Sequence, residues 1–309
     1  MNYTFAVIDL GSNSARMSIS RIDENQKLTV IKKLRETVRL SEGMGQDNFL
    51  KEEAMVRVIE ALKNFCNIAK EYKCISIAAV ATAAVRGAAN KELFLSRVEK
   101  ATGIKLEVIS GEDEAYYSYL AVSETVGIND GVIFDTGGGS TEITLVRDGK
   151  VKKSISLPLG AVVLTERMAH SNQMQLYRYV ASHIGAISWL DECESLDMYG
   201  IGGSVRTLAM INKGSLLTTD ETDNMKIPYS SVAKIYQKIF NTKPEKRRDI
   251  KGMDVSRADI ILAGLTPMKV LMDMTGSKNL TVCGAGVKEG VLFRMKNEIT
   301  EKYREQNGK

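Results

Sequence analysis

Two stretches of the sequence each place an aspartate directly before a turn of small residues: Asp9-Leu-Gly-Ser-Asn-Ser14 and Asp135-Thr-Gly-Gly-Gly-Ser-Thr141. Apolar, strand-like residues precede each aspartate and alternate after each turn, so each copy predicts a strand, a turn and a return strand. The amides and hydroxyls of such turns can surround a phosphate group. One copy alone would be explained equally well as a tight hairpin, but two matched copies favour a pair of phosphate-binding loops. The residues expected to bind substrate phosphates there are Ser12, Asn13, Ser14, Gly137, Gly138, Gly139, Ser140 and Thr141.

Acidic residues beside the second turn point to a metal ion. Glu142 follows the turn at the start of the return strand, after Asp135 has ended the incoming strand. An acid next to a phosphate-binding loop would be poorly placed without a cation, and carboxylates are ligands that Mg²⁺ accepts. The sequence therefore predicts a Mg²⁺ site that uses Asp135, with Glu142 as a second candidate ligand.

A third acidic segment, Ser110-Gly-Glu-Asp-Glu114, lies between a predicted strand and a predicted helix. Ser110 can cap the helix, and acids in a first turn suit the helix dipole, so capping alone is one explanation. Hydrolysis also needs a base near the metal-bound phosphate, and the chain offers no better candidate than this segment. Arg86, in a loop of small residues, could hold a phosphate with two hydrogen bonds, although a surface arginine at a helix entrance is the simpler explanation.

The composition argues against several other kinds of chemistry. Neither histidine, His170 or His183, lies in a glycine-rich or acidic cluster, so histidine phosphotransfer and a Ser-His-Asp triad are not expected. The 4 cysteines are scattered without a C-x-x-C pair, which argues against zinc and indicates free thiols. The first strand begins within the opening residues and no apolar run is long enough for a membrane helix, so we expect a cytoplasmic protein without a membrane partner. A net charge of +4 with 6% aromatic residues does not predict nucleic-acid binding.

The two hairpins open halves of similar pattern, which predicts a duplicated α/β unit rather than a single sheet. We expect one domain over residues 1–125 and a second over residues 126–309. The periodicity of apolar residues predicts helices at 51–70, 90–102, 116–122, 173–190, 230–240 and 287–303, and strands at 74–80, 104–109, 196–201 and 279–283. A third glycine turn is expected at 200–203.

The order and content of these motifs resemble those of the Ppx/GppA phosphatases over almost the whole chain. The motifs that carry the resemblance are Asp9-Leu-Gly-Ser-Asn-Ser14, Ala81-Thr-x-Ala-x-Arg86, Ile109-Ser-Gly-x-x-Glu114-Ala, Asp135-x-Gly-Gly-Gly-Ser-Thr-Glu142, Leu157-Pro-Leu-Gly160 and Arg257-Ala-Asp259. The resemblance implies the actin/hexokinase-type (ASKHA) α/β fold, with two related domains flanking a cleft, in the short two-domain form of the family. It also implies Mg²⁺-dependent hydrolysis of terminal phosphates from linear polyphosphate or from guanosine pentaphosphate (pppGpp).

Several residue roles follow from the resemblance by motif position. Glu114 matches the family's catalytic base, and Arg86 matches its phosphate-binding arginine. Asp9, Asp135 and Glu142 match the acids that manage metal and water.

Other positions depart from the family pattern or suggest a further contact. Val163 stands where an arginine is common, and Val287-Lys-Glu-Gly290 replaces a Leu-Arg-Glu-Gly pattern. These departures concern the substrate rather than the fold. The third glycine turn, with Gly203 and Ser204, resembles the place where relatives in the wider fold bind adenosine, and in a phosphatase it is expected to bind phosphates or nothing.

Two other classes of function share the phosphate loops. An ATP-dependent kinase of the same fold would be expected to use an aspartate base and a nucleotide pocket at 200–204, whereas Glu114 in Ser-Gly-x-x-Glu favours a hydrolase. An actin-type nucleotide switch would assemble on binding nucleotide, without fast turnover. A homodimer is compatible with the sequence but is not indicated by any motif.

Overall fold

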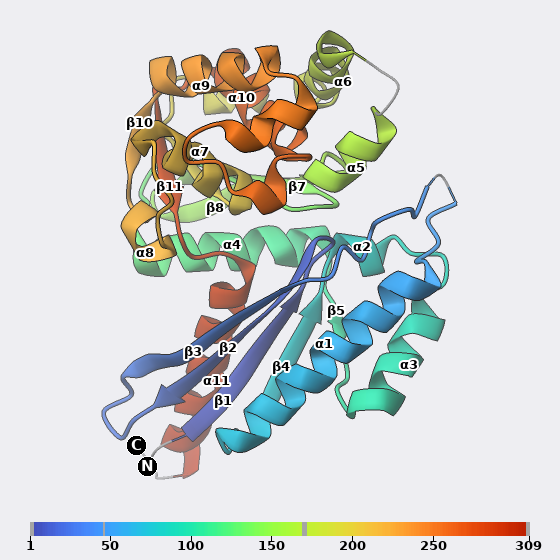
Figure 1. Cartoon of the computed structure of the whole chain (residues 1–309). Helices are drawn as coiled ribbons and strands as arrows, with labels where there is room; N and C mark the ends of the chain where they lie inside the picture. Colours follow the sequence, from blue (N-terminus) through green and yellow to red (C-terminus); the bar gives the residue numbers. More distant parts are fainter. Residues whose placement is uncertain (1–2, 46, 169–171, 307–309) are drawn as a thin grey trace. The chain divides into compact units, whose positions relative to one another are not determined.

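The structure, a computed structural model, describes residues 3–45, 47–168 and 172–306, and the side chains as far as residue 301. The chain forms two compact units (Figure 1). Unit 1 comprises Met1–Tyr117 and Val287–Lys309, and unit 2 comprises Ser118–Gly286. Among the described helices, none combines the length and the hydropathy that a membrane span requires.

Unit 1 contains a five-stranded sheet and its helices. Its elements are β1 (Tyr3–Leu10), β2 (Ser14–Ile22), β3 (Leu28–Thr37), α1 (Glu52–Glu71), β4 (Ile77–Ala81), α2 (Ala83–Arg86), α3 (Lys91–Thr102), β5 (Glu107–Val108), the start of α4 (Gly111–Thr125) and α11 (Val287–Gln306). The strand order is β3-β2-β1-β4-β5. The first three strands are antiparallel along the chain, and β4 and β5 join in parallel.

Unit 2 contains a six-stranded sheet. Its elements are the rest of α4, β6 (Gly131–Thr136), β7 (Thr141–Arg147), β8 (Lys150–Leu157), α5 (Ala161–Arg167), α6 (Gln173–Gly185), β9 (Met198–Ile201), α7 (Gly203–Lys213), α8 (Thr219–Thr222), β10 (Lys226–Pro228), α9 (Tyr229–Asn241), α10 (Ile261–Thr275) and β11 (Asn279–Cys283), with short 3₁₀ turns at Leu190–Cys193, Pro244–Asp249 and Val255–Arg257. Read from the opposite edge, the order is β8-β7-β6-β9-β11-β10.

The two sheets repeat the same plan. In each, an antiparallel three-stranded meander is followed by two strands that join in parallel beside its first strand. Unit 2 adds β10 as an antiparallel edge strand. This correspondence confirms the duplicated α/β architecture predicted from the two hairpins.

Alternating residues of the central strands cover both faces of each sheet. In unit 1, Ile8 packs with helices α1 and α3, while Phe5 and Val7 pack with Val291 and Leu292 of α11. Each such buried side chain contributes roughly 1.5–3 kcal/mol through removal of apolar surface from water. The packing of α11 on β1 explains why the C-terminal segment belongs to unit 1.

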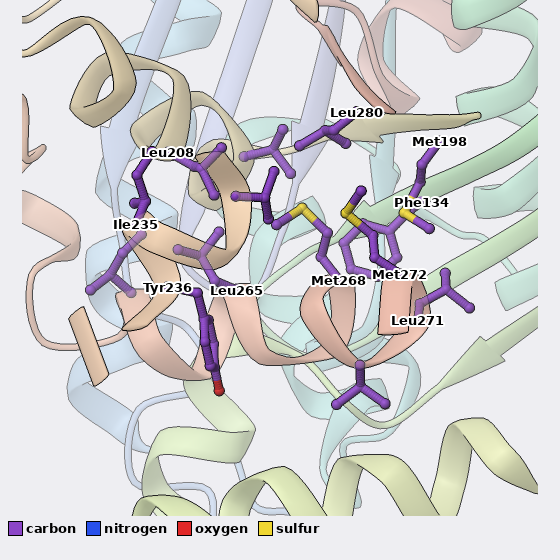
Figure 2. Packing of buried hydrophobic residues seen from close by; sticks show 14 of the residues in the cluster. Phe134, Met198, Leu208, Ile235, Tyr236, Leu265, Met268, Leu271, Met272 and Leu280 are labelled. Carbon is purple, nitrogen blue, oxygen red and sulfur yellow. The ribbon is translucent and has the colours of Figure 1, made fainter. Parts of the chain in front are cut away.

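In unit 2 the larger core lies between the sheet and helices α5, α6, α7, α9 and α10. Figure 2 shows Phe134 and Met198 of the sheet beside Met268 and Met272 of α10. The other face is covered in part by α4, through Val122 packed with Ile133.

The compact units divide the chain differently from the predicted domains at two places. The change between units falls within α4, after Tyr117, rather than after residue 125, and the chain returns to unit 1 at Val287 instead of remaining in the second domain. A helix that crosses between units shows no composition change at the crossing. Helix α11 packs on β1, but nothing in the sequence of this C-terminal helix indicates which strand it contacts.

The predicted elements agree in type with the structure, and several bounds differ. The helix expected at 173–190 ends at Gly185, and the strand expected at 104–109 is only Glu107–Val108. Edge strands β3 and β8 and the buried helix α10 were not predicted. The edge strands are largely solvated and the helix is apolar on nearly all sides, so neither shows a clear period.

Candidate functional site

The two glycine turns close in the same way. The amide of Gly11 donates to the carbonyl of Ser14 at 3.1 Å, and the amide of Gly137 donates to the carbonyl of Ser140 at 3.0 Å. Each turn follows a strand that ends one residue beyond an aspartate, and a return strand follows each turn. The two sequence motifs therefore form equivalent loops, one in each unit.

The loop of unit 2 rests on the start of α5. The carbonyl of Gly137 accepts from the amide of Ala161 at 3.0 Å, and the carbonyl of Gly138 accepts from the amides of Val162 and Val163 at 2.9 and 3.2 Å. In a trans peptide the amide points away from the preceding carbonyl, so the amides of Gly138 and Gly139 are directed away from α5. Amides oriented in this way can bind an anion.

Gly160 allows this close approach. A Cβ atom at Gly160 would lie 2.3 Å from the carbonyl carbon of Gly139 and 2.4 Å from that of Gly138. Any larger residue would have to displace the loop backbone. Gly160 of the Leu157-Pro-Leu-Gly160 motif is therefore needed for the loop backbone to pack against the start of α5.

The loop of unit 1 is supported by a different segment. The carbonyl of Asn13 accepts from the amides of Val38 and Arg39 at 3.1 and 2.9 Å, and the carbonyl of Ser12 accepts from the amide of Ser41 at 3.1 Å. The same peptide geometry directs the amides of Asn13 and Ser14 away from residues 38–41.

Both loops hold buried polar atoms that no described protein group satisfies. Within the described part of the chain, Ser12 Oγ, Asn13 Nδ2 and Ser140 Oγ are buried and have no hydrogen-bond partner. Such atoms cost free energy unless a ligand or water binds them. Thr141 differs, because its hydroxyl donates to the carbonyl of Leu159 at 2.9 Å and is used within the fold.

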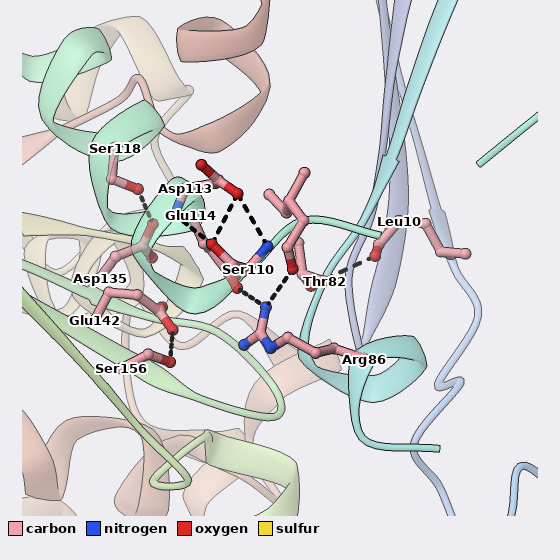
Figure 3. A network of polar contacts seen from close by, with 11 residues as sticks. Leu10, Thr82, Arg86, Ser110, Asp113, Glu114, Ser118, Asp135, Glu142 and Ser156 are labelled. Atoms are coloured by element: carbon pink, nitrogen blue, oxygen red, sulfur yellow. Dashed lines mark hydrogen bonds and ion pairs between the residues drawn. The ribbon is translucent and has the colours of Figure 1, made fainter. Parts of the chain in front are cut away.

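Two carboxylates of unit 2 lie opposite one another on neighbouring strands. Asp135 of β6 is paired in register with Glu142 of β7, so both side chains lie on one face of the sheet. Ser118 Oγ donates to Asp135 Oδ2 at 2.8 Å, and Ser156 Oγ donates to Glu142 Oε1 at 2.7 Å (Figure 3). Neither Ser118 nor Ser156 was predicted from the sequence, because each reaches an acid far along the chain.

This donor set fits a magnesium ion held partly by substrate. Among the described residues, no group of three or more His, Cys, Asp or Glu side chains is arranged to bind a metal. Mg²⁺ commonly binds through only one or two carboxylates, with water and substrate phosphates as its other ligands. Asp135 and Glu142 would supply those carboxylates.

In unit 1, Arg86 and Glu114 form an ion pair. Arg86 Nη1 donates to Glu114 Oε2 at 3.0 Å and to the carbonyl of Ile109 at 3.0 Å (Figure 3). Glu114 is only 6% exposed. Arg86 and Glu114 were predicted as separate site residues, and the structure shows that they are in direct contact.

The neighbouring acids have simpler roles. Asp113 Oδ2 accepts from Ser110 Oγ at 2.7 Å, and Ser110 Oγ accepts from the amide of Asp113 at 3.0 Å, which forms a cap at the start of α4. Glu112 is exposed. The capping explanation therefore holds for Ser110 and Asp113, while Glu114 points into the protein.

The third glycine turn is covered within unit 2. A Cβ atom at Gly203 would lie 1.9 Å from Cζ of Arg257. A Cβ atom at Gly264 would lie 2.2 Å from Ser204 Oγ, so this hydroxyl faces α10 closely. Arg257 itself pairs with Asp254 at 3.7 Å. Substrate binding by Gly203 and Ser204 stays a prediction, since the contacts seen for both are internal.

The cysteines and His183 have ordinary structural surroundings within the described residues. Burial, together with the nearby charges of Asp223 and Asp135, raises the pKa of Cys283 to about 12, so its thiol stays protonated at neutral pH. All 4 cysteines are free. His183 Nδ1 lies 2.9 Å from the carbonyl of Tyr179, and His170 lies outside the described residues.

Comparison with known proteins identifies the family of this chain. The family model described as the Ppx/GppA phosphatase family matches residues 18–299. The chain belongs to the Ppx/GppA phosphatase family. This confirms the family resemblance that the motifs carry.

Solved structures of the family have the same architecture. The structure of the Ppx/GppA family member of Aquifex aeolicus is 28% identical with a TM-score of 0.80, and the match covers 98% of this chain and 99% of that one. A structure described as an exopolyphosphatase from Cytophaga hutchinsonii is 23% identical with a TM-score of 0.88 and covers 96% of this chain and 98% of that one, which shows the shared fold. The ASKHA-type fold expected from the motifs is confirmed.

Curated relatives of the Ppx/GppA family are longer than this chain. A bifunctional 3-dehydroquinate synthase/phosphatase of Fusobacterium nucleatum is 32% identical, and the match covers 94% of this chain but 47% of that protein. A guanosine-5'-triphosphate,3'-diphosphate pyrophosphatase of Vibrio vulnificus is 28% identical, with 96% and 60% covered. The chain thus spans about half of the length of these relatives.

Proposed function

We propose that this Ppx/GppA phosphatase hydrolyses terminal phosphates of linear inorganic polyphosphate, releases orthophosphate and requires Mg²⁺. The observation that carries the proposal is the repeated loop. In both units, buried polar atoms of Ser12, Asn13 and Ser140 have no partner in the described part of the chain. A chain of phosphates offers many acceptor oxygens of one kind, which suits two loops of the same design.

Each group would have a separate task in hydrolysis. The amides and hydroxyls of the two loops bind phosphate oxygens and favour the charge that develops during displacement. Asp135 and Glu142 would hold Mg²⁺, with Asp9 as a further acid near the first loop. When bound there, the cation would neutralise part of the charge of the phosphates.

Glu114 is proposed to position the water that attacks the terminal phosphorus and to accept its proton. Its ion pair with Arg86 fixes the orientation of the carboxylate. Arg86 therefore contributes to the reaction through Glu114, in addition to any phosphate contact that the family resemblance implies.

Guanosine pentaphosphate is the second candidate substrate. It is favoured by the Vibrio relatives, whose name describes a pyrophosphatase for guanosine-5'-triphosphate,3'-diphosphate. An ATP-dependent kinase is less well supported, because Arg257 covers Gly203 at the turn where adenosine would be expected. A cytoplasmic location and a possible homodimer stay predictions; unpaired cysteines support the former.

The test is orthophosphate release by the purified chain with Mg²⁺ on long-chain polyphosphate, pppGpp and ATP, beside Glu114→Gln. We expect release from polyphosphate, and a decrease of roughly 10²- to 10⁴-fold in the variant, because a positioned base contributes about that much. Glu112→Gln is the matched control, since Glu112 is an exposed acid on the same helical turn. Release from pppGpp alone would select the second candidate, and turnover of ATP only with an added acceptor would refute hydrolysis.

A further inference from the structure

The hydroxyl of Ser118 leaves its own helix to reach a carboxylate. Serine and threonine within helices commonly donate to the carbonyl four residues earlier. Thr125 does so in α4, donating to Ala121 at 2.7 Å. Ser118 of the same helix instead donates to Asp135 Oδ2 at 2.8 Å, and the two residues are 1% and 9% exposed. The bond therefore joins α4 to the end of β6 in a place largely shielded from water.

Two glycines leave room for the Asp135 carboxylate. A Cβ atom at Gly202 would lie 3.5 Å from Asp135 Oδ1, and one at Gly286 would lie 3.9 Å from Oδ2. Neither glycine has a side chain that could fix the χ2 torsion of Asp135. In aspartate this torsion is broad and only weakly restricted. The hydroxyl of Ser118, by donating to Oδ2, restricts this rotation.

We propose that Ser118 is a positioning residue for the cation site, which fixes the Asp135 carboxylate in the orientation that binds the divalent metal. The inference rests on the proposed function in that it takes Asp135 as a metal ligand. Groups that hydrogen-bond to metal-binding carboxylates orient them and tune metal affinity. Ser156, which donates to Glu142, has the same relation to the neighbouring acid.

Ser118 lies on α4, and the proposed effect of its hydroxyl is confined to Asp135 within unit 2. An enzyme with Asp135 misoriented should lose metal affinity first, while binding of phosphate by the glycine loops is retained.

The experiment measures Mn²⁺ binding without turnover. In a Glu114→Gln background, Mn²⁺ is titrated in the presence of tripolyphosphate, and the bound ion is detected by enhanced water-proton relaxation. Ser118→Ala should raise the Mn²⁺ dissociation constant by about 10- to 100-fold. Ser118→Thr keeps the hydroxyl and should restore binding. Ser20→Ala removes a buried hydroxyl that has no partner in the described residues, and it should change nothing.

Each outcome decides the proposal. Unchanged Mn²⁺ affinity in Ser118→Ala, or no Mn²⁺ binding by the Glu114→Gln parent, would overturn it. If Ser118→Ala fails to fold, Ser118→Cys provides a similar size with a weak donor, and retained affinity there would be equally damaging. Orthophosphate release by the otherwise native chain is measured separately, so a chain without phosphatase activity on polyphosphate would refute the proposed substrate and leave the Mn²⁺ comparison valid.

Discussion

The two hairpins share a backbone plan but differ in the residue that faces the aspartate. In unit 1, Asp9 lies opposite Arg16 on the return strand, whereas in unit 2 Asp135 lies opposite Glu142. Residues directly opposite in an antiparallel pair share a face of the sheet and interact. The first aspartate thus has a basic residue opposite it in the register, while the second has another acid.

This difference separates two properties of the duplicated motif, phosphate binding and cation binding. Phosphate binding by loop amides depends on the backbone, which both hairpins share. Cation binding depends on the side-chain pair, because two neighbouring carboxylates repel one another unless a cation lies between them. We therefore propose that the principal Mg²⁺ contacts lie in unit 2, and that Asp9 acts on water or through the phosphates.

The largest expected effect comes from giving the second hairpin the charge pattern of the first. Glu142→Arg would place a cation opposite Asp135, as Arg16 stands opposite Asp9. Loss of a metal ion removes several kcal/mol of charge stabilisation, so phosphate release should fall by roughly 10²- to 10³-fold and should no longer increase with Mg²⁺. The measurement is the rate of release as a function of Mg²⁺ concentration.

A charge-matched control separates this effect from a change in net charge. Glu124→Arg alters an exposed acid of α4 by the same amount and should leave the Mg²⁺ dependence intact. If Glu142→Arg retained a normal response to Mg²⁺, the assignment of the metal to the second hairpin would be wrong.

A smaller effect is expected from the supports behind the loops. The loop of unit 2 lies against Gly160, whereas the loop of unit 1 is held by residues 38–41. Gly160→Ala must push the Gly138–Gly139 backbone aside, and such overpacking costs about 1–3 kcal/mol of folding free energy. Chemical denaturation should show this loss, and phosphate release should fall with it because the loop amides move.

Gly185→Ala provides the matched control for that substitution. Gly185 is the last residue of α6, and an added Cβ atom would make only an ordinary contact of 3.6 Å with Met274 Cε. We expect no loss of stability and a gain of up to about 0.5–1 kcal/mol, since alanine is the better helix former. Equal destabilisation by both substitutions would remove the special role assigned to Gly160.

The hairpins were predictable because their signal is local. A strand, a glycine turn and a return strand follow one another in sequence, and the structure confirms both copies. The same holds for the cap formed by Ser110 and Asp113, whose donors and acceptors lie within one helical turn.

Features that join distant segments could not be predicted in this way. The bond from Ser118 to Asp135 spans 17 positions and that from Arg86 to Glu114 spans 28. No spacing rule connects such pairs. The resemblance to a family selected Arg86 and Glu114 separately, and only the fold shows that they touch. For the same reason the return of α11 to unit 1 was missed.

The smallest expected effect concerns the serine hydroxyls of the two loops. Removing them one at a time compares the two hairpins directly. Ser12 Oγ and Ser140 Oγ have no hydrogen-bond partner in the described chain, so Ser12→Ala and Ser140→Ala should change the folding free energy by no more than about 0.5 kcal/mol. If each hydroxyl donates to a substrate phosphate, its loss should raise KM by roughly 2- to 10-fold, which corresponds to about 0.5–1.5 kcal/mol.

Thr141→Val is the contrasting variant, because the Thr141 hydroxyl already donates to the carbonyl of Leu159. It should lower stability by about 1 kcal/mol. A loss of stability in the serine variants equal to that in Thr141→Val would mean that their hydroxyls serve the fold. An increase in KM from only one of the two serine variants would show that the loops, despite their common backbone, do not hold the substrate equally.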